Sequence, residues 1–232
     1  MDARTPRERI VEAATELLTT GGREAVSTRA GSAAAGVQAP TIYRLFGAKQ
    51  GLLEAVGDHG LAEYLHTKTA RERDPDPVAD LRRGWDLHVG FGLENPALYA
   101  LVFGEVRPGV EVPAVRQSVA VLADMVRRIA EAGRLRVGEE RAVHLVHSTG
   151  RGLTLTLIAT PPELRDPGLS GFVREAVIAA ITTDEPAAGD GAVPAAVTMR
   201  AALPELEVLT EAERGLMREW LDRVVSPSSR PA

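Results

Sequence analysis

Apolar residues recur at intervals of three and four along most of this chain, which is the spacing of one face of an α-helix. The first such stripe consists of Ile10, Ala13, Ala14, Leu17 and Leu18. Thr5 and Glu8 precede it with the spacing of a capping box, and Pro6 suits the first helical position. Because β-branched residues rarely alternate with polar ones, the pattern predicts an all-α protein.

Glycine, proline and capping residues divide this pattern into separate helices. The first helix is expected to end at Gly21-Gly22, and a second to run from Ser27 to Ala35. A tight turn at Gly36 then leads into a third helix over about residues 38–46. Later helices are expected at about residues 49–73, 78–93, 96–103, 114–132, 139–159, 170–182, 195–203 and 211–225. Residues 183–193 are typical of a flexible linker, and we expect the last residues to fray.

The formal net charge is −5, but the charge is unevenly distributed. Residues 1–56 carry 7 basic and 6 acidic side chains, and the remaining residues carry a net charge of −6. From Arg23 to Lys49 there are four basic residues against Glu24 alone. A local basic patch on an acidic body is suited to binding phosphates without indiscriminate association.

The composition also argues against several classes of protein. The chain has no cysteine, which excludes disulfides, thiolate metal sites and a cysteine nucleophile. Its first residues are charged and no apolar run is long enough to cross a bilayer, so we expect a cytoplasmic protein with no membrane partner. Because no nucleophile–base pair, carboxylate pair or phosphate-binding loop stands out, we expect neither an enzyme nor a cofactor.

Residues 36–53 have the arrangement of the second half of a helix-turn-helix. The landmarks are Gly36-Val37, Thr41-Ile42-Tyr43, Phe46-Gly47, Lys49 and Leu52-Leu53. Gln38 and Thr41 lie at the start of a short helix, where a recognition helix meets base edges in the major groove. The other predicted DNA contacts are Thr28, Arg29, Tyr43, Arg44 and Lys49. The alternative is three helices of a larger core that carry ordinary surface charges.

These landmarks follow a capped N-terminal helix, and together they resemble the DNA-binding domain of TetR-type transcriptional regulators. The resemblance covers about residues 7–56 and includes a local run at residues 93–104. It implies a helix-turn-helix DNA-binding domain at residues 1–48. It further implies a helical effector-binding and dimerisation domain at residues 49–232, and a homodimer that binds a double-stranded DNA operator and a small-molecule effector.

The resemblance also bears on single residues. The family's DNA contacts carry over to Gln38, Thr41, Tyr43 and Lys49, whereas contact by Arg44 is inferred from its position in the helix. Four positions depart from the family's pattern. They are Gly31, where a large aliphatic residue is usual, Ser32, where Ala is common, Ala48, where a capping Ser or Asn is usual, and Gln50, where an acidic residue is usual. These departures predict a module of modest stability.

The larger domain carries aromatic, histidine and basic residues at helical spacing that can line a ligand site. The candidates are Trp85, His88, Phe91, Tyr99, Phe103, Met125, His144, His147 and Arg151. The alternative is that the aromatic residues belong to the core. We predict no metal site, because no carboxylate accompanies the three histidines at ligand spacing.

Two later helices, at about residues 139–159 and 170–182, are apolar on most faces, which is unusual for the surface of a monomer. Their small residues permit close approach between helices. The candidate dimer-interface residues are Val146, Gly150, Leu153, Leu157, Phe172, Ala176 and Ala180. The alternative is burial within one subunit, and the resemblance favours the interface.

The leading hypothesis is a homodimeric repressor that a small molecule releases from DNA. Its two recognition helices would enter successive major grooves about 34 Å apart on a near-palindromic operator. A ligand would favour a state in which that spacing no longer fits. The alternative is a ligand-independent activator or architectural DNA binder. An enclosed apolar pocket in the larger domain would discriminate between the two.

Overall fold

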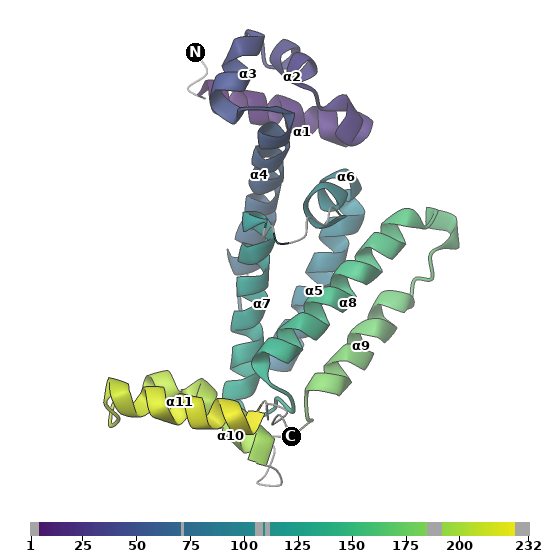
Figure 1. Cartoon of the computed structure of the whole chain (residues 1–232). Helices are drawn as coiled ribbons and strands as arrows, with labels where there is room; N and C mark the ends of the chain where they lie inside the picture. The colour runs from purple at the N-terminus through teal and green to yellow at the C-terminus, as the bar shows by residue number, and fades with distance from the viewer. Residues whose placement is uncertain (1–4, 71, 105–108, 110–111, 185–191, 226–232) are drawn as a thin grey trace, which may run out of the picture. The chain divides into compact units, whose positions relative to one another are not determined.

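The computed structural model describes residues 5–70, 72–104, 109, 112–184 and 192–225. The fold is all-α, as the sequence predicts, and no strand occurs in these ranges. The helices are α1 (Pro6–Ala25), α2 (Thr28–Ala34), α3 (Ala39–Phe46), α4 (Lys49–Ala70), α5 (Pro77–Glu94), α6 (Pro96–Tyr99), α7 (Pro113–Glu131), α8 (Glu139–Ala159), α9 (Leu169–Ile181), α10 (Ala192–Ala202) and α11 (Glu211–Val225) (Figure 1).

Three short segments complete the helical elements. They are the π-helical turn η1 (Ala100–Gly104) and the 3-10 turns η2 (Pro162–Leu164) and η3 (Leu203–Glu205). The expected linker at 183–193 falls mostly on residues 185–191, outside the described residues, as does the expected frayed end after residue 225. Among the described helices, none combines the length and the hydropathy needed to cross a bilayer.

The chain forms two compact units. Unit 1 comprises Met1–Arg71, Val89–Ser118 and Thr154–Pro162, and unit 2 comprises Glu72–His88, Val119–Leu153 and Glu163–Ala232. The first three helices therefore share a unit with α4, α6 and η1. The domain boundary expected after residue 48 coincides with the start of α4 at Lys49, and as a boundary between domains it stays a prediction.

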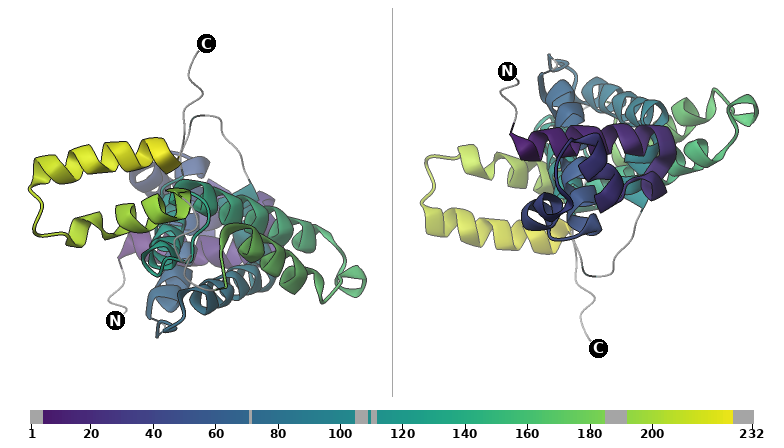
Figure 2. Two further views of the ribbon diagram at one scale, coloured as in Figure 1. Left: turned by 90° about the horizontal axis from the view of Figure 1, so that it is seen from below. Right: turned by 90° about the horizontal axis from the view of Figure 1, so that it is seen from above.

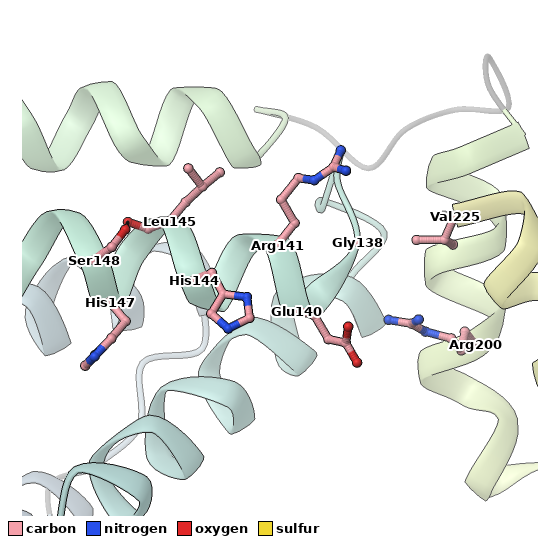
Figure 3. Close-up of a pocket in the computed structure, with 9 residues that line it drawn as sticks. All are labelled: Gly138, Glu140, Arg141, His144, Leu145, His147, Ser148, Arg200 and Val225. Carbon is pink, nitrogen blue, oxygen red and sulfur yellow. Dashed lines mark hydrogen bonds between the residues drawn. The ribbon is translucent and has the colours of Figure 1, made fainter. Parts of the chain in front are cut away.

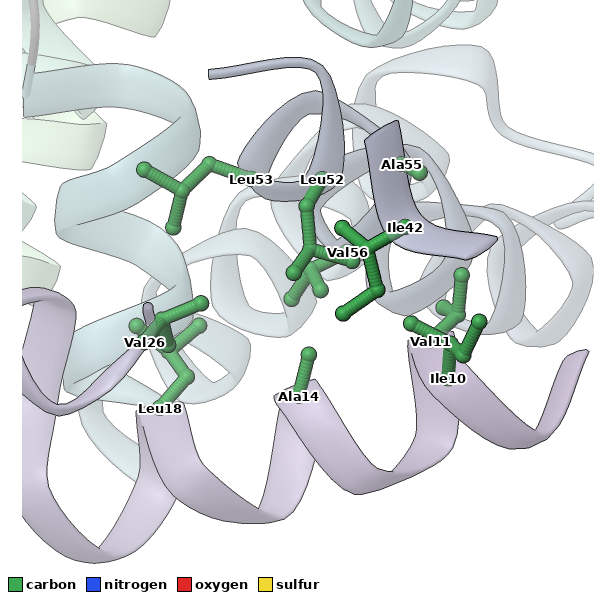
Figure 4. Packing of buried hydrophobic residues seen from close by; sticks show 10 residues of the cluster. All are labelled: Ile10, Val11, Ala14, Leu18, Val26, Ile42, Leu52, Leu53, Ala55 and Val56. Atoms are coloured by element: carbon green, nitrogen blue, oxygen red, sulfur yellow. The ribbon is translucent and has the colours of Figure 1, made fainter. Parts of the chain in front are cut away.

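The N-terminal helices of unit 1 pack on one apolar core, shown in Figure 4. Its buried members are Ile10, Val11, Ala14, Leu18, Val26, Ile42, Leu52, Leu53, Ala55 and Val56. They come from α1, the α1–α2 turn, α3 and the first turns of α4. Helices of seven and eight residues are marginal in isolation, so their burial against α1 and α4 stabilises them.

Local signals in the sequence account for the ends of these helices. The expected capping box is present: the Glu8 amide donates to Thr5 Oγ1, and the Thr5 amide donates to Glu8 Oε2 at 2.7 Å. Gly36 and Gly47 have φ of 62° and 73° in the turns on either side of α3, a backbone region that favours glycine. Gly22 produces a kink, and α1 continues to Ala25 instead of ending there as expected.

Within unit 1, Gly57 and Gly60 of α4 lie where α6 and η1 approach. A Cβ atom on Gly60 would lie 2.4 Å from Leu98 Cδ2, and one on Gly57 would lie 3.2 Å from Val102 Cγ2. Leu98, with Ala97 and Leu101, also packs against the N-terminal core. The residues of α6 therefore connect that core to the middle of α4.

Unit 2 contains an antiparallel hairpin of α10 and α11, which lie side by side in both views of Figure 2. Arg200 of α10 donates to Asp222 of α11 at 2.8 Å and to Glu139 of α8 at 3.2 Å. Val225 is buried, and its Cγ1 would lie 2.8 Å from a Cβ atom on Gly138. These contacts attach the hairpin to the start of α8.

Candidate nucleic-acid interface and effector residues

The helix α3 has one buried face and one polar exposed face. Ile42 is fully buried, whereas Gln38, just before the helix, and Arg44 are exposed. Tyr43 is 56% exposed although it follows a core residue directly. A hydroxylated aromatic residue held this far into solvent can contact DNA directly. The narrow helix and its exposed polar side chains are compatible with entry into a major groove.

The start of α2 lies beside the middle of α3. Thr28 Oγ1 and Tyr43 Oη are 3.5 Å apart, and Ser27 caps α2 by accepting from the Ala30 amide at 3.0 Å. Arg29 is exposed, and Thr41 is half-buried. The structure thus brings Thr28 and Tyr43 together on one polar surface, as a phosphate contact from both helices requires.

The start of α4 is tied to the end of α1 through polar side chains. Lys49 Nζ lies 3.9 Å from Glu24 Oε2, and the Glu24 side chain is 92% exposed. An ion pair this exposed is worth little, so a DNA phosphate can compete for Lys49. Arg23 donates to Gln50 Oε1 at 3.3 Å, and Gln50 Nε2 donates to Glu54 Oε1 at 3.1 Å. Gln50 therefore bridges Arg23 and Glu54 at a position where the sequence suggested only a departure from the family.

Three of the predicted ligand residues form a series of rings in unit 1. The ring centroids of Phe91 and Tyr99 are 6.3 Å apart, and those of Tyr99 and Phe103 are 4.6 Å apart. Tyr64 of α4 extends the series by stacking on Phe91 at 4.4 Å. Burial, with a smaller effect from Tyr99, raises the pKa of Tyr64 above its ordinary value. Sequence analysis missed Tyr64, although its spacing from Leu61 marks it as part of the inner face of α4.

The other predicted ligand residues lie in unit 2 and are more dispersed. Trp85 is buried and donates through Nε1 to Ser170 Oγ at 3.1 Å, which ties α5 to α9. Gly150 of α8 packs on the same ring, because a Cβ atom there would lie 3.5 Å from Trp85 Cζ3 and 3.8 Å from His88 Cδ2. Met125 is also buried, and Arg151 is half-buried. The contacts of Trp85 are those of a core residue.

His144 and His147 instead line an open groove of about 460 Å³ between α8 and the α10–α11 hairpin (Figure 3). The lining is Gly138, Glu140, Arg141, His144, Leu145, His147, Ser148, Arg200 and Val225. Within the described part of the chain, no group of three or more potential ligand side chains could hold a metal ion. The nine predicted ligand residues are thus divided between the two units, and Phe91, Tyr99 and Phe103 form the ring series of unit 1.

The seven candidate interface residues also fall into two groups. Val146, Gly150, Leu153 and Leu157 of α8 are already buried by the chain itself. Phe172, Ala176 and Ala180 of α9 are exposed, and Phe172 is 75% exposed. The structure therefore leaves the α9 residues available for a partner, while the four α8 residues pack within the protomer.

Residues 10–56 match the family described as bacterial regulatory proteins, tetR family. The match begins at Ile10 and ends at Val56, so it contains the whole N-terminal core described above. Residues 10–56 of this chain are therefore a TetR-family module. This family is one of transcription regulators, and the resemblance inferred from the sequence is thereby confirmed. No curated protein sequence matches this chain.

Solved structures share the fold of this chain at low sequence identity. A tetR family transcription regulator from Shewanella sp. PV-4 is 21% identical with a TM-score of 0.61, over 78% of this chain and 100% of that one. SmeT, the repressor of the Stenotrophomonas maltophilia multidrug efflux pump SmeDEF, is 21% identical with a TM-score of 0.59, over 81% and 96%. FadR from Bacillus subtilis, in complex with stearoyl-CoA, is 16% identical with a TM-score of 0.60, over 75% and 98%.

Proposed function

We propose that this TetR-family regulator is a homodimeric repressor that binds a near-palindromic operator and is released by a small molecule. The observation that carries the proposal is the polar surface of α3, where Tyr43 and Arg44 are exposed directly beside the buried Ile42. A short helix that presents such side chains is what major-groove recognition requires. SmeT, which shares the fold, is itself a repressor.

The route from effector to DNA runs through unit 1 in this proposal. Tyr99 and Phe103 belong to the ring series, and Leu98, next to Tyr99, fills the space above Gly60 and packs on the N-terminal core. A guest that displaces these rings would move α6 and, through it, the packing of α1 against α4. The change in the free energy of operator binding would equal the difference between the guest's binding free energies for the displaced and the undisplaced state.

The chemistry of the ring series favours an effector with a large apolar part. Phe91 and Phe103 offer apolar surface only, and Tyr64 and Tyr99 add one hydroxyl each. FadR, which shares the fold, is described in complex with stearoyl-CoA. An acyl or polycyclic compound is therefore the effector class that we propose for screening.

A dimer is part of the proposal because two recognition helices at fixed spacing are needed for a palindromic site. The exposed surface of α9 supports it, since Phe172 presents a large apolar ring beside the small Ala176. Small residues around an aromatic anchor allow two helices to approach closely.

The proposal is tested by selecting operator DNA from a random pool with the full chain and then measuring binding by fluorescence anisotropy across salt concentrations. Tyr43→Ala and Lys49→Ala should each weaken binding about tenfold, which corresponds to a loss of about 1.4 kcal/mol of binding free energy. Lys49→Ala should also reduce the slope of log K against log salt by about 1, because one phosphate contact is lost. Tyr43→Ala should leave that slope unchanged, since a hydroxyl releases no counterion.

The matched control is Arg218→Ala, which removes an exposed basic residue from α11 in unit 2. This variant should bind the selected DNA like the wild type. Equal affinities for Tyr43→Ala, Lys49→Ala and the wild type would contradict the proposed interface. A selection that enriches no sequence would contradict operator recognition itself.

A further inference from the structure

The last helix, α11, exposes an apolar stripe that the function proposed above does not use. Leu216, Trp220 and Val224 are 47%, 55% and 39% exposed. They are spaced four residues apart, so they follow one another along a single side of the helix. Tryptophan is costly to leave in water, and exposed apolar side chains that form a continuous row mark interaction surfaces.

This stripe is separate from the face that α11 uses within the chain. Val225 is buried against the start of α8, and Asp222 pairs with Arg200 of α10 at 2.8 Å. Met217 and Leu221 are half-buried. One side of α11 therefore packs within the hairpin. The stripe lies on another side of the helix, which the described residues leave more exposed.

We propose that α11 packs antiparallel against α11 of a second copy of this chain. If the twofold axis passes at Trp220, each residue of one helix faces the residue of the other copy that lies equally far from Trp220 in the opposite direction. Leu216 then faces Val224 of the partner subunit, and the two Trp220 side chains meet at the axis. An isologous contact requires this kind of self-complementary pattern, and the spacing of the three apolar residues supplies it.

Charges beside the stripe fit the same pairing. Glu219 and Arg223 lie four residues apart on one flank, and within the chain they form an ion pair with each other. A twofold axis brings the same flank of both helices together, so Glu219 comes beside the partner's Arg223, about 3 Å away along the helix axis. The same axis brings the two Glu219 side chains about 3 Å apart and the two Arg223 side chains about 9 Å apart along the helix axis, so the two opposite-charge approaches outnumber the one close like-charge approach.

The size of the stripe decides what such a contact can do. A standard interface buries about 800 Å² on each partner, which three partly exposed side chains cannot provide. The α11 pairing is therefore a second contact between copies that adds to another interface, of which the α9 surface is the one proposed above. It does not depend on DNA binding.

Sedimentation velocity of the full chain over a range of concentrations tests the proposal. Trp220→Glu should weaken self-association about tenfold or more, since it places a carboxylate beside its own copy at the axis. Leu216→Glu is a second variant with the same expected direction. The control is Val208→Glu, which makes the same kind of change at an apolar residue that is 87% exposed before α11 and outside the stripe.

Association of both stripe variants equal to that of the wild type would overturn the proposal. So would an equal loss of association in Val208→Glu, because the effect would then come from added charge alone. Circular dichroism at each concentration verifies that the variants fold. Operator binding by the wild type is a separate measurement, so failure of the repressor proposal is distinguished from failure of this one.

The register can be tested by cross-linking, because the chain contains no cysteine. A mixture of Leu216→Cys and Val224→Cys variants should form a disulfide-linked heterodimer on oxidation. Leu216→Cys alone should not, since its two copies would be about 12 Å apart along the helix axis and a disulfide needs Cα atoms within about 7 Å. Cross-linking of Leu216→Cys alone, as readily as in the mixture, would overturn the antiparallel register.

Discussion

The N-terminal core of unit 1 and the helices of unit 2 differ in the polar interactions that accompany their apolar packing. In the first, ten buried apolar residues from α1, α3, α4 and the α1–α2 turn pack on one another. In the second, apolar residues such as Leu81, Ile129 and Ile181 are also buried, and ion pairs connect α5 to α7 and α9. The Arg128–Asp80 pair is 2.8 Å long with both side chains largely buried, and the Arg82–Glu175 pair is 2.9 Å long at the surface.

This difference shows where changes of pH and salt can act. Apolar burial does not depend on protonation, so the fold of the DNA-binding helices should change little over the range in which carboxylates titrate. Ion pairs lose their contribution when the carboxylate is protonated, and exposed pairs are also screened by salt. Unit 2 is therefore expected to respond first to acid. Three predictions test this contrast.

The largest expected effect is for Arg128→Met. Asp80 is 2% exposed, and Arg128 joins it to the Asp74 carbonyl, to which Arg128 Nη2 donates at 2.9 Å. Loss of one partner of a buried pair typically costs about 3–5 kcal/mol. Urea denaturation should report this loss, and hydrogen exchange should show lower protection in α5 and α7.

The control for this change is Arg82→Met, which removes the cation from a surface pair and should cost less than about 1 kcal/mol. Equal costs for the two variants would contradict the difference drawn between buried and exposed pairs. Lower protection in α1–α3 as well would contradict the separate behaviour of the two units.

A second prediction concerns two glycines of unit 1. A Cβ atom on Gly31 would lie 3.4 Å from Leu52 Cδ2, an ordinary contact, whereas one on Gly51 would lie 2.0 Å from the Phe46 carbonyl oxygen. Gly31→Ala should therefore stabilise the N-terminal core by up to about 1 kcal/mol, because alanine is the better helix former. Gly51→Ala should destabilise it by about 1–3 kcal/mol through overpacking.

Thermal melts of both variants at pH 7 and pH 4 provide the measurement. The two shifts should have opposite signs and should be nearly the same at both pH values. A destabilising Gly31→Ala would show that the core has no room at this position, contrary to the geometry.

The smallest expected effect is that of Glu175→Gln, and it should depend on pH. Hydrogen bonds from Arg82 and then Arg174 lower the pKa of Glu175 below its ordinary value of 4.5. The fold therefore favours the ionised form, and its contribution is present above pH 4.5 and disappears as the pH falls through the lowered value. The variant should be less stable than the wild type by under about 1 kcal/mol at pH 7.

The same comparison at acidic pH provides the check. Below the lowered pKa of Glu175, both chains carry a neutral group at position 175, so the difference in unfolding free energy should become smaller. A difference that grows toward acid would show that the Arg82 and Arg174 pairs do not stabilise the charged form.

The sequence predicted the N-terminal module well because short-range signals determine it. The capping box and the turn at Gly36 each follow from residues within a few positions of one another. The family match over residues 10–56 lies on the same stretch. Interactions within a helix or a turn leave patterns that spacing alone can reveal.

The effector region was harder to predict because its contacts join distant segments. Trp85 reaches Ser170, and Tyr64 stacks on Phe91, pairs that no helical spacing can connect. Spacing also grouped Gly150 with Phe172 as interface residues, whereas the first packs on Trp85 and the second is 75% exposed. A single sequence shows which residues can be buried, and the fold decides what buries them.

The close approach of Leu98 to Gly60 has a consequence for how this protein can evolve. A Cβ atom at position 60 would lie 2.4 Å from Leu98 Cδ2, so even the methyl group of alanine does not fit while Leu98 keeps its position. A larger residue at 60 therefore requires another rotamer of Leu98, a smaller residue at 98 or a shift of α6. Positions 60 and 98 should change together among descendants of this chain, and that joint variation would be visible in sequences alone.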